Sequence, residues 1–215
     1  MEFFLDTANL DEIKQATELG LIDGVTTNPT LLSREGGDWV GLMKNICSAV
    51  KGPVSLELVK ETINDMIVEA EELASFGDNV VIKVPMTQEG LVVVRRLAQK
   101  GIRTNVTLIF TPMQALLAAK AGATYVSPFV GRLDGIGEDG MGMIEQLRII
   151  FDNYQINTKI LVASIRHANH VLESALLGAD VATVPFAVIT DLMKHPLTDK
   201  GLAAFKKDWE SLTHV

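Results

Sequence analysis

The sequence contains a single cysteine, Cys47, among its 215 residues. One cysteine excludes an internal disulfide and a cysteine-ligated metal cluster, and it is typical of a reducing compartment. The sequence also lacks an apolar run of the ~18 residues that a membrane span requires. Its first residues, MEFFLDTANLDE, contain no basic segment followed by a long apolar one, so no signal peptide is expected. These absences predict a soluble cytoplasmic protein that does not associate with membranes.

Positive charge is scarce, with 19 Lys and Arg against 27 Asp and Glu and a net charge of −8. A broad nucleic-acid surface needs clustered positive charge, so nucleic acid is not an expected partner. A small anionic substrate remains compatible with this balance, because two arginines can bind one phosphate locally. The length and the hydrophobic content of 47% are enough for one well-packed domain, and no low-complexity linker divides the chain.

Short apolar runs rich in β-branched residues recur along the whole chain and predict strands. The eight runs cover residues 2–6, 24–28, 54–59, 80–84, 103–109, 124–130, 159–164 and 181–185. Segments with helical spacing lie between them, at 9–20, 61–76, 87–100, 112–121, 140–154, 166–177 and 198–212. Asn9 followed by Glu12 has the pattern of a capping box at the start of the first helix.

Alternating strands and helices favour a parallel sheet, and a count of eight units favours its closure into a (β/α)8 barrel, a TIM barrel of the α/β class. The predicted strands lack regular polar alternation, as expected for parallel strands that are covered on both faces. An open, doubly wound sheet is the main alternative. We expect residues 1–215 to form one barrel domain, with a C-terminal helix at about 198–212.

A lysine stands inside one of the apolar runs, NVVIKVP, where Lys83 follows three β-branched residues. A fully buried lysine is rare unless it is paired. Other polar residues also stand near the carboxyl ends of the predicted strands, where the chemistry of a barrel is located. They are Asp6, Thr26, Thr27, Asn28, Glu57, Asn105, Thr107, Ser127, Ser164 and Arg166. Each alone has a structural explanation: Thr26 to Asn28 as a helix cap, and Glu57 with Lys83 as an ion pair. Together, two carboxylates and a lysine at three strand ends favour an active site.

The lysine and carboxylates fit a specific type of reaction. A lysine amine has a pKa of ~10.4 in water, and burial can lower that pKa by up to ~3–5 units. A neutral amine attacks a carbonyl to form a Schiff base, whose protonated imine supports cleavage of a nearby carbon–carbon bond. Asp6 and Glu57 are the carboxylates available to move the protons. The residues therefore favour a lysine-dependent aldol reaction, without identifying a sugar.

Five segments carry a resemblance to a known family: FFLDTANLDEI, GVTTNPTLL, VVIKVPMTQEGL, YVSPFVGRLD and LVASIR. Over essentially its whole length the sequence resembles the small-subunit transaldolase family, which includes fructose-6-phosphate aldolase. The resemblance implies a (β/α)8 barrel in which Lys83 forms the Schiff base and Asp6 accepts the substrate hydroxyl proton. It also implies that Glu57 is an acid and base acting through a water held with Thr107.

The resemblance further implies a set of substrate-binding residues. Asn28 and Asn105 would orient hydroxyls of a bound dihydroxyacetone unit, and we group Thr27 and Phe129 with them. Arg132, Ser164 and Arg166 would bind the phosphate, since guanidinium groups bind phosphate oxygens in a bidentate manner. No metal or organic cofactor is expected, because the lysine supplies the electron sink.

Glu57 and Phe129 resemble the transaldolase branch, whereas the aldolase branch carries glutamine and tyrosine at these positions. The implied reaction converts sedoheptulose 7-phosphate and glyceraldehyde 3-phosphate to erythrose 4-phosphate and fructose 6-phosphate. Two alternatives remain: an aldolase that splits fructose 6-phosphate and releases dihydroxyacetone, and a barrel that binds sugar phosphates without catalysis. The resemblance also implies a homo-oligomer, a pentamer or a decamer.

Two histidines, His167 and His170, are spaced for one face of a helix and could ligate a metal. No third ligand of matching character is evident near them in the sequence. We therefore interpret the pair as part of a surface face rather than a metal site.

Overall fold

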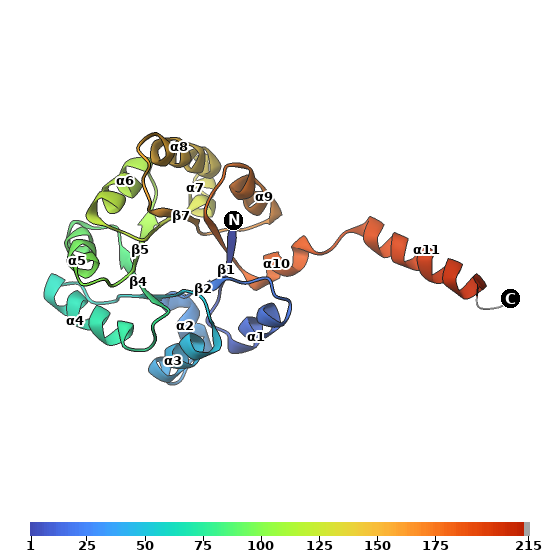
Figure 1. The fold of residues 1–215 in the computed structure, drawn as a ribbon, viewed down its shortest axis with the longest axis horizontal. Coiled ribbons are helices and arrows are strands. Elements are labelled where there is room, and N and C mark those ends of the chain that lie inside the picture. The colour runs from blue at the N-terminus through green and yellow to red at the C-terminus, as the bar shows by residue number, and fades with distance from the viewer. Residues whose placement is uncertain (213–215) are drawn as a thin grey trace.

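The computed structural model, which describes residues 1–212, contains eight parallel strands that close into a barrel in chain order (Figure 1). The strands are β1 (Glu2–Asp6), β2 (Gly24–Thr26), β3 (Val54–Glu57), β4 (Val80–Pro85), β5 (Thr104–Ile109), β6 (Tyr125–Pro128), β7 (Lys159–Val162) and β8 (Val181–Val184). β1 pairs with both β2 and β8, so the sheet has no open edge. The predicted barrel is confirmed, and the open sheet is excluded.

Several strands end earlier than the apolar runs predict. β2 stops at Thr26 rather than at residue 28, because Asn28 becomes the N-cap of the next helix and accepts a hydrogen bond from the Leu31 backbone N–H at 3.0 Å. Pro29 at the first helical position also favours a helix start at this point. The TTNP segment thus combines a strand end with a helix cap.

Helices surround the barrel, except for the last helix, which extends away from it (Figure 1). Within the described residues they are α1 (Leu10–Glu18), α2 (Pro29–Glu35), α3 (Trp39–Ala49), α4 (Ile63–Ala74), α5 (Gln88–Gln99), α6 (Pro112–Ala121), α7 (Val130–Asp134), α8 (Gly140–Asn153), α9 (Ala168–Leu176), α10 (Phe186–Leu192) and α11 (Pro196–Leu212). Four helices lie outside the segments with helical spacing: α3, although its buried Met43, Ile46 and Cys47 recur at helical intervals, and the short helices α2, α7 and α10. Helices of one or two turns contain too few residues to show a periodic apolar pattern.

The capping box predicted at Asn9 and Glu12 is wrong in one half. The Asn9 side chain accepts hydrogen bonds from the Asp11 and Glu12 backbone N–H groups, as an N-cap should. The Glu12 carboxylate does not return to Asn9; it accepts a hydrogen bond from Thr7 Oγ1 at 2.5 Å. A reciprocal capping box occurs instead at Thr111 and Gln114, where α6 begins.

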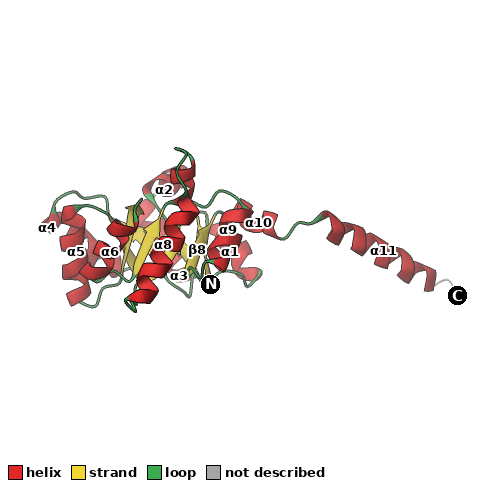
Figure 2. Cartoon of the chain, turned by 90° about the horizontal axis from the view of Figure 1, so that it is seen from above, coloured by secondary structure: helices red, strands yellow, loops and turns green. Residues whose placement is uncertain are grey.

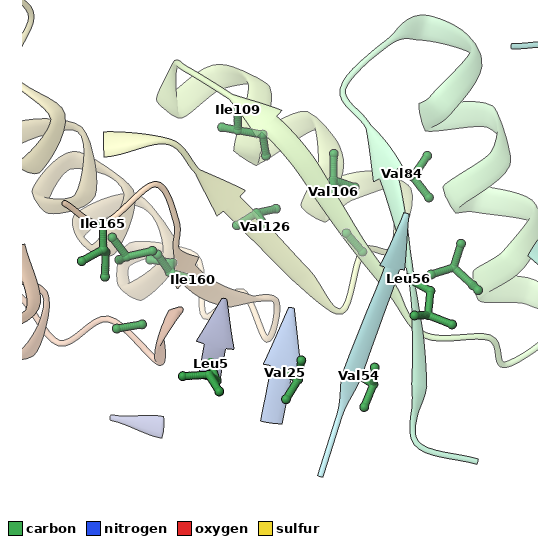
Figure 3. Close-up of a cluster of buried hydrophobic side chains, with 14 of the residues drawn as sticks. Leu5, Val25, Val54, Leu56, Val84, Val106, Ile109, Val126, Ile160 and Ile165 are labelled. Atoms are coloured by element: carbon green, nitrogen blue, oxygen red, sulfur yellow. The ribbon is translucent and has the colours of Figure 1, made fainter. Parts of the chain in front are cut away.

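The apolar core has two parts. The larger part lies between the strands and the helices, where side chains such as Leu5, Val54 and Val126 gather outside the barrel (Figure 3). The smaller part fills the inside of the barrel with Phe4, Val81, Tyr125, Leu161, Ala163 and Val181. Because side chains alternate along a strand, the inward positions that follow Phe4 and Val81 are Asp6 and Lys83. The apolar inner layer therefore supports a polar layer nearer the carboxyl ends of the strands.

Helix α11 projects away from the barrel instead of covering it (Figure 2). None of its residues is buried, and its large apolar side chains include Leu202 and Phe205 with exposed fractions of 62% and 73%. The helix starts at Pro196, slightly before the expected 198. The expected domain also included residues 213–215, which lie outside the described residues. Across residues 1–212, no helix is both long enough and apolar enough to cross a membrane.

Candidate active site

A cavity of about 880 Å³ lies at the carboxyl ends of the strands. Figure 2 shows α2 above this end of the barrel, opposite the N-terminus. Eight residues that were given a role from the sequence line it: Asp6, Asn28, Glu57, Lys83, Phe129, Arg132, Ser164 and Arg166. They come from β1, β3, β4 and the segments that follow β2, β6 and β7. The fold thus collects in one place residues that are far apart in the chain.

Lys83 lies on the inner face of β4 with only 5% of its surface exposed. Its Nζ is 3.0 Å from Glu57 Oε2 and donates a hydrogen bond to the Thr27 carbonyl oxygen at 3.0 Å. The strand register explains the first contact, since Glu57 on β3 is directly opposite Lys83. The buried amine is therefore held by one carboxylate and one carbonyl, and it faces the cavity.

Asp6 is the last residue of β1, at its carboxyl end, and lines the same cavity. Thr26 Oγ1 donates a hydrogen bond to Asp6 Oδ1 at 2.9 Å and lies 2.5 Å from Thr183 Oγ1. The Thr26 hydroxyl has one proton and donates it to Asp6, so the Thr183 hydroxyl is the donor in its contact with Thr26. Burial raises the pKa of Asp6, while the Lys83 charge and the Thr26 hydrogen bond oppose that rise and the Glu57 charge adds to it. The net direction is upward, as expected for a carboxyl group adapted to proton transfer.

Thr27 and Asn105 are fully buried and do not line the cavity. The Thr27 hydroxyl donates to the Ser55 carbonyl oxygen at 2.8 Å, so only its own carbonyl contacts Lys83. Asn105 donates from Nδ2 to Ser55 Oγ at 3.2 Å and accepts at Oδ1 from Ser127 Oγ at 2.6 Å. This network fixes the orientation of the Asn105 amide beside the Lys83 strand.

Strand β5 is irregular between Val106 and Ile109, where its register with β6 shifts. Leu108 has φ of 60°, which is rare for a residue other than glycine, and its side chain lines the cavity. Alternation from Asn105 would put Ile109 inside the barrel, yet Ile109 packs in the outer core. Thr107, at this irregularity, is buried, and within the described residues its Oγ1 has no hydrogen-bond partner. Thr107 does not line the cavity, and a buried hydroxyl of this kind can bind a buried water.

The two arginines stand beside each other on α7 and on the segment after β7. The Arg132 guanidinium carbon lies 4.9 Å from the centre of the Phe129 ring. A Cβ atom on Gly131 would come within 2.2 Å of the Ser164 carbonyl oxygen and 2.6 Å of Arg166 Cγ, so glycine is required for this approach. Ser164 itself has φ of 60°. The close packing brings two guanidinium groups and a serine to one side of the cavity.

The structure adds polar groups to the set chosen from the sequence. Ser127 and Thr183 line the cavity, as does Arg34 from α2. Ser127 and Thr26 stood among the strand-end residues but received no role. Thr183 follows the inward-facing Val181 by two positions, so strand alternation could have predicted that its side chain also points into the barrel. Arg34 lies on a short exposed helix and could not be found from the sequence pattern.

The expectation that His167 and His170 belong to a surface face is wrong for His170, which is buried with 3% exposed. A third possible ligand also exists, since Asp134 brings a carboxylate oxygen to within 4.8 Å of ligand atoms of both histidines. The His170 ring already uses both nitrogens: Nε2 is 2.6 Å from Asp134 Oδ2, and Nδ1 accepts from the Arg166 backbone N–H at 3.2 Å. Hydrogen bonding accounts for the cluster.

Replacing Asp6 with Asn is expected to stabilise the fold at pH 7. The pKa of Asp6 in the folded state is raised above its ordinary value of 3.8, so the folded protein holds this proton more tightly than the unfolded chain does. The free energy of unfolding of the wild type therefore falls as pH rises from 3.8 through the folded-state pKa. Urea midpoints of Asp6→Asn and wild type should be close near pH 4 and should diverge toward pH 7, with the variant more stable.

The exposed Asp208→Asn change serves as the control and should give no pH-dependent difference. An Asp6→Asn advantage that stays constant from pH 4 to pH 7 would contradict the raised pKa.

Comparison with known proteins gives a consistent result. The family model for transaldolase/fructose-6-phosphate aldolase matches residues 3–215. A protein of Maridesulfovibrio salexigens described as "probable transaldolase" is 72% identical over 99% of this chain and 100% of its own length. Another, from Thermodesulfovibrio yellowstonii and described in the same words, is 60% identical over 99% of both chains.

A solved structure from Coccidioides immitis, of a protein proposed to be a fructose-1,6-biphosphate aldolase, superposes with a TM-score of 0.60 at 18% identity. It covers 87% of this chain and 74% of its own, and it supports the fold alone. With a family match over almost the whole length and relatives of this similarity, the chain belongs to the transaldolase/fructose-6-phosphate aldolase family.

Proposed function

We propose that this enzyme transfers a dihydroxyacetone unit between sugar phosphates and carries that unit as a Schiff base on Lys83. Transaldolase activity itself follows from the family match and from 72% identity over the full length of a relative. The roles of individual residues are our proposal. The observation that carries it is the buried Lys83 amine, held at 3.0 Å by Glu57 inside a cavity that Asp6 also lines.

Glu57 is placed to move the protons of Schiff-base formation. Its Oε2, at 3.0 Å from Nζ, can accept a proton from the ammonium and leave the neutral amine that attacks the ketone carbonyl. The same carboxyl group then protonates the departing hydroxyl, so that water leaves and the iminium forms. The buried Thr107 hydroxyl is the proposed ligand for that water.

Asp6 is the proposed base for cleavage of the carbon–carbon bond. It removes the proton of the substrate hydroxyl beside the scissile bond, and that oxygen becomes the carbonyl of the departing aldehyde. The bonding electrons move into the iminium, which becomes an enamine on Lys83. The raised pKa of Asp6 favours this exchange, because a stronger base takes the hydroxyl proton more readily. Addition of the enamine to an acceptor aldehyde reverses these steps and returns the proton.

Four further residues are proposed to bind the substrate. Arg132, Ser164 and Arg166 form the phosphate site, where two guanidinium groups lie on one side of the cavity. Asn28 lines the cavity and is proposed to bind hydroxyls of the three-carbon unit. Thr27 and Asn105 contribute from the layer beneath: Thr27 through its carbonyl to Lys83, and Asn105 through the network of Ser55 and Ser127.

The pair of Glu57 and Phe129 favours transfer over release of free dihydroxyacetone. Phe129 packs edge to face against Phe110 with ring centres 5.9 Å apart, and it offers no acidic proton to the cavity. An enamine beside a phenyl ring is not protonated by it and persists until an aldehyde arrives. The proposed reaction interconverts sedoheptulose 7-phosphate and glyceraldehyde 3-phosphate with erythrose 4-phosphate and fructose 6-phosphate.

We also propose that the chain forms a homo-oligomer, a pentamer or a decamer, through α11. This helix extends from the barrel with an apolar stripe that includes Leu202 and Phe205, and none of its residues is buried within its own chain. A stripe of this kind is stabilised when a second copy covers it. The proposed compartment is the cytoplasm, where sugar phosphates occur and Cys47 stays a free thiol.

The central test counts glyceraldehyde 3-phosphate released from fructose 6-phosphate per active site. Without acceptor, release should stall near one equivalent, because each Lys83 retains its three-carbon unit. Addition of erythrose 4-phosphate should restart the release.

Lys83→Met should fold and show neither phase of release, and borohydride should trap a three-carbon adduct on Lys83 of the wild type only. Sustained release without acceptor would identify an aldolase instead.

The branch assignment has its own test in Phe129→Tyr, which keeps Glu57 as the acid and base of Schiff-base formation. A tyrosine hydroxyl beside the enamine can donate a proton, so acceptor-independent release of dihydroxyacetone should rise at least tenfold, which corresponds to about 1.4 kcal/mol. The matched control is Phe110→Tyr, on the ring that faces Phe129. No rise in Phe129→Tyr would show that this position does not by itself separate the activities.

Phe205→Asp is expected to lower the molecular mass in solution, because a charge on the α11 stripe opposes burial of that stripe by another copy. Light scattering gives the mass directly. Leu176→Asp places the same change on an exposed residue of α9, 76% exposed, and should leave the mass unchanged. An unchanged mass in Phe205→Asp would remove α11 from the proposed interface.

A further inference from the structure

We propose that His170 is a positioning residue for the phosphate site and that it acts by holding the backbone of Arg166. The inference rests on the proposed role of Arg166 as a phosphate ligand. It concerns a buried histidine to which the Schiff-base chemistry gives no role. His170 lies in the first turn of α9, directly after the segment that carries Ser164 and Arg166.

The His170 ring connects two elements through its two nitrogens. Nδ1 accepts a hydrogen bond from the Arg166 backbone N–H at 3.2 Å. An acceptor role at Nδ1 places the proton of the neutral ring on Nε2, which donates to Asp134 Oδ2 at 2.6 Å. The His170 side chain is 4% exposed, whereas the Asp134 side chain is 40% exposed, so water has little access to the ring itself. The ring therefore has one defined orientation and one defined tautomer.

Asp134 fixes the other end of this connection. It is the last residue of α7, the short helix that carries Arg132. Its second oxygen, Oδ1, accepts from the Gly140 backbone N–H at 3.1 Å, close to the start of α8. The carboxylate thus joins α7 to α8 with one oxygen and to His170 with the other.

The two arginines consequently stand on elements joined by one imidazole. Arg132 follows Gly131, against which the Arg166 stem and the Ser164 carbonyl pack too closely for any side chain at that position. Arg166 is exposed, and a long exposed side chain has many rotamers. Holding its backbone at the base limits where the guanidinium can go, and a defined geometry lowers the entropic cost of binding phosphate.

Two near-isosteric substitutions separate the contacts. In His170→Asn the amide oxygen can occupy the place of Nδ1 and accept from Arg166, while the contact with Asp134 is lost. In His170→Gln the longer amide can reach Asp134 and leaves Arg166 without its acceptor. Both variants remain polar, so neither places an apolar side chain beside the partly exposed Asp134 carboxylate.

The measurement is the ratio of kcat/KM for erythrose 4-phosphate to kcat/KM for erythrose, with fructose 6-phosphate as donor. In a reaction of two half-steps, kcat/KM for the acceptor reports only the loaded enzyme and that acceptor, so the phosphate of the donor does not enter the ratio. We expect the ratio to fall about tenfold in His170→Gln, the usual scale for one lost hydrogen bond in a buried site, and by less than threefold in His170→Asn. The value for erythrose should stay unchanged in both.

Two controls make the result specific. His195→Asn changes an exposed histidine whose Nδ1 accepts from the Leu197 backbone N–H at 3.1 Å, and its ratio should equal that of the wild type. Arg166→Gln must lower the ratio if Arg166 binds phosphate. A normal ratio in Arg166→Gln would overturn the proposed phosphate site itself.

With Arg166→Gln impaired, an unchanged ratio in His170→Gln would overturn the positioning role alone. Equal losses in His170→Gln and His170→Asn would also overturn it, as would equal losses for erythrose and erythrose 4-phosphate, because a general loss of structure would lower both. A fall for the phosphorylated acceptor in His170→Gln, with recovery in His170→Asn, supports it.

Discussion

The buried ion pair of Lys83 and Glu57 is the constraint on which the rest of the structure depends. An ammonium and a carboxylate inside a barrel lose their hydration, and several kcal/mol of that loss must be offset by mutual attraction and hydrogen bonds. The Thr27 carbonyl supplies one such bond to Nζ, and β3 and β4 are paired so that the two side chains stand opposite each other. The apolar layer around Phe4 and Tyr125 closes the barrel beneath them. The apolar layer inside the barrel thus stabilises the fold, and the polar layer at the carboxyl ends of the strands carries the chemistry.

This arrangement explains why the polar residues form connected groups. Asp6 is linked to Thr26 and, through it, to Thr183, while Asn105 is linked to Ser55 and Ser127. Buried polar groups are costly when they are unpaired, and networks of this kind remove that cost and fix side-chain orientation. Among the described residues the exceptions are the Thr104 and Thr107 hydroxyls and Arg148 Nε, and of these the Thr107 hydroxyl is the one that we propose as a ligand for water. On β5, the Asn105 amide is therefore hydrogen-bonded at both Nδ2 and Oδ1, whereas Thr107, two positions later, has a hydroxyl that can bind water.

Much of the fold could be predicted from the sequence, because eight β-branched runs with helical segments between them leave few arrangements other than a closed barrel. Lys83 could be found because charge inside an apolar run is rare. The irregularity of β5 could not, since Leu108 at φ of 60° follows no glycine or proline signal. The contact between Asp134 and His170 could not be predicted either, because it joins residues 36 positions apart, at the end of α7 and in the first turn of α9. Local patterns encode the elements, whereas contacts between short helices depend on packing.

The hydrogen bond between Thr26 and Thr183 has a consequence for the order of assembly. It spans 157 positions, and it forms only when the last strand, β8, docks beside the first, β1. Ordering so distant a pair requires a large loss of chain entropy before any contact compensates it, which makes such closures slow. Asp6 is near the N-terminus, but the Thr183 hydroxyl that contacts Thr26 beside it belongs to the last strand. The complete Asp6–Thr26–Thr183 network therefore forms only after nearly all of the barrel has folded. A truncated or partly folded chain therefore lacks an oriented base for carbon–carbon cleavage as well as a closed barrel.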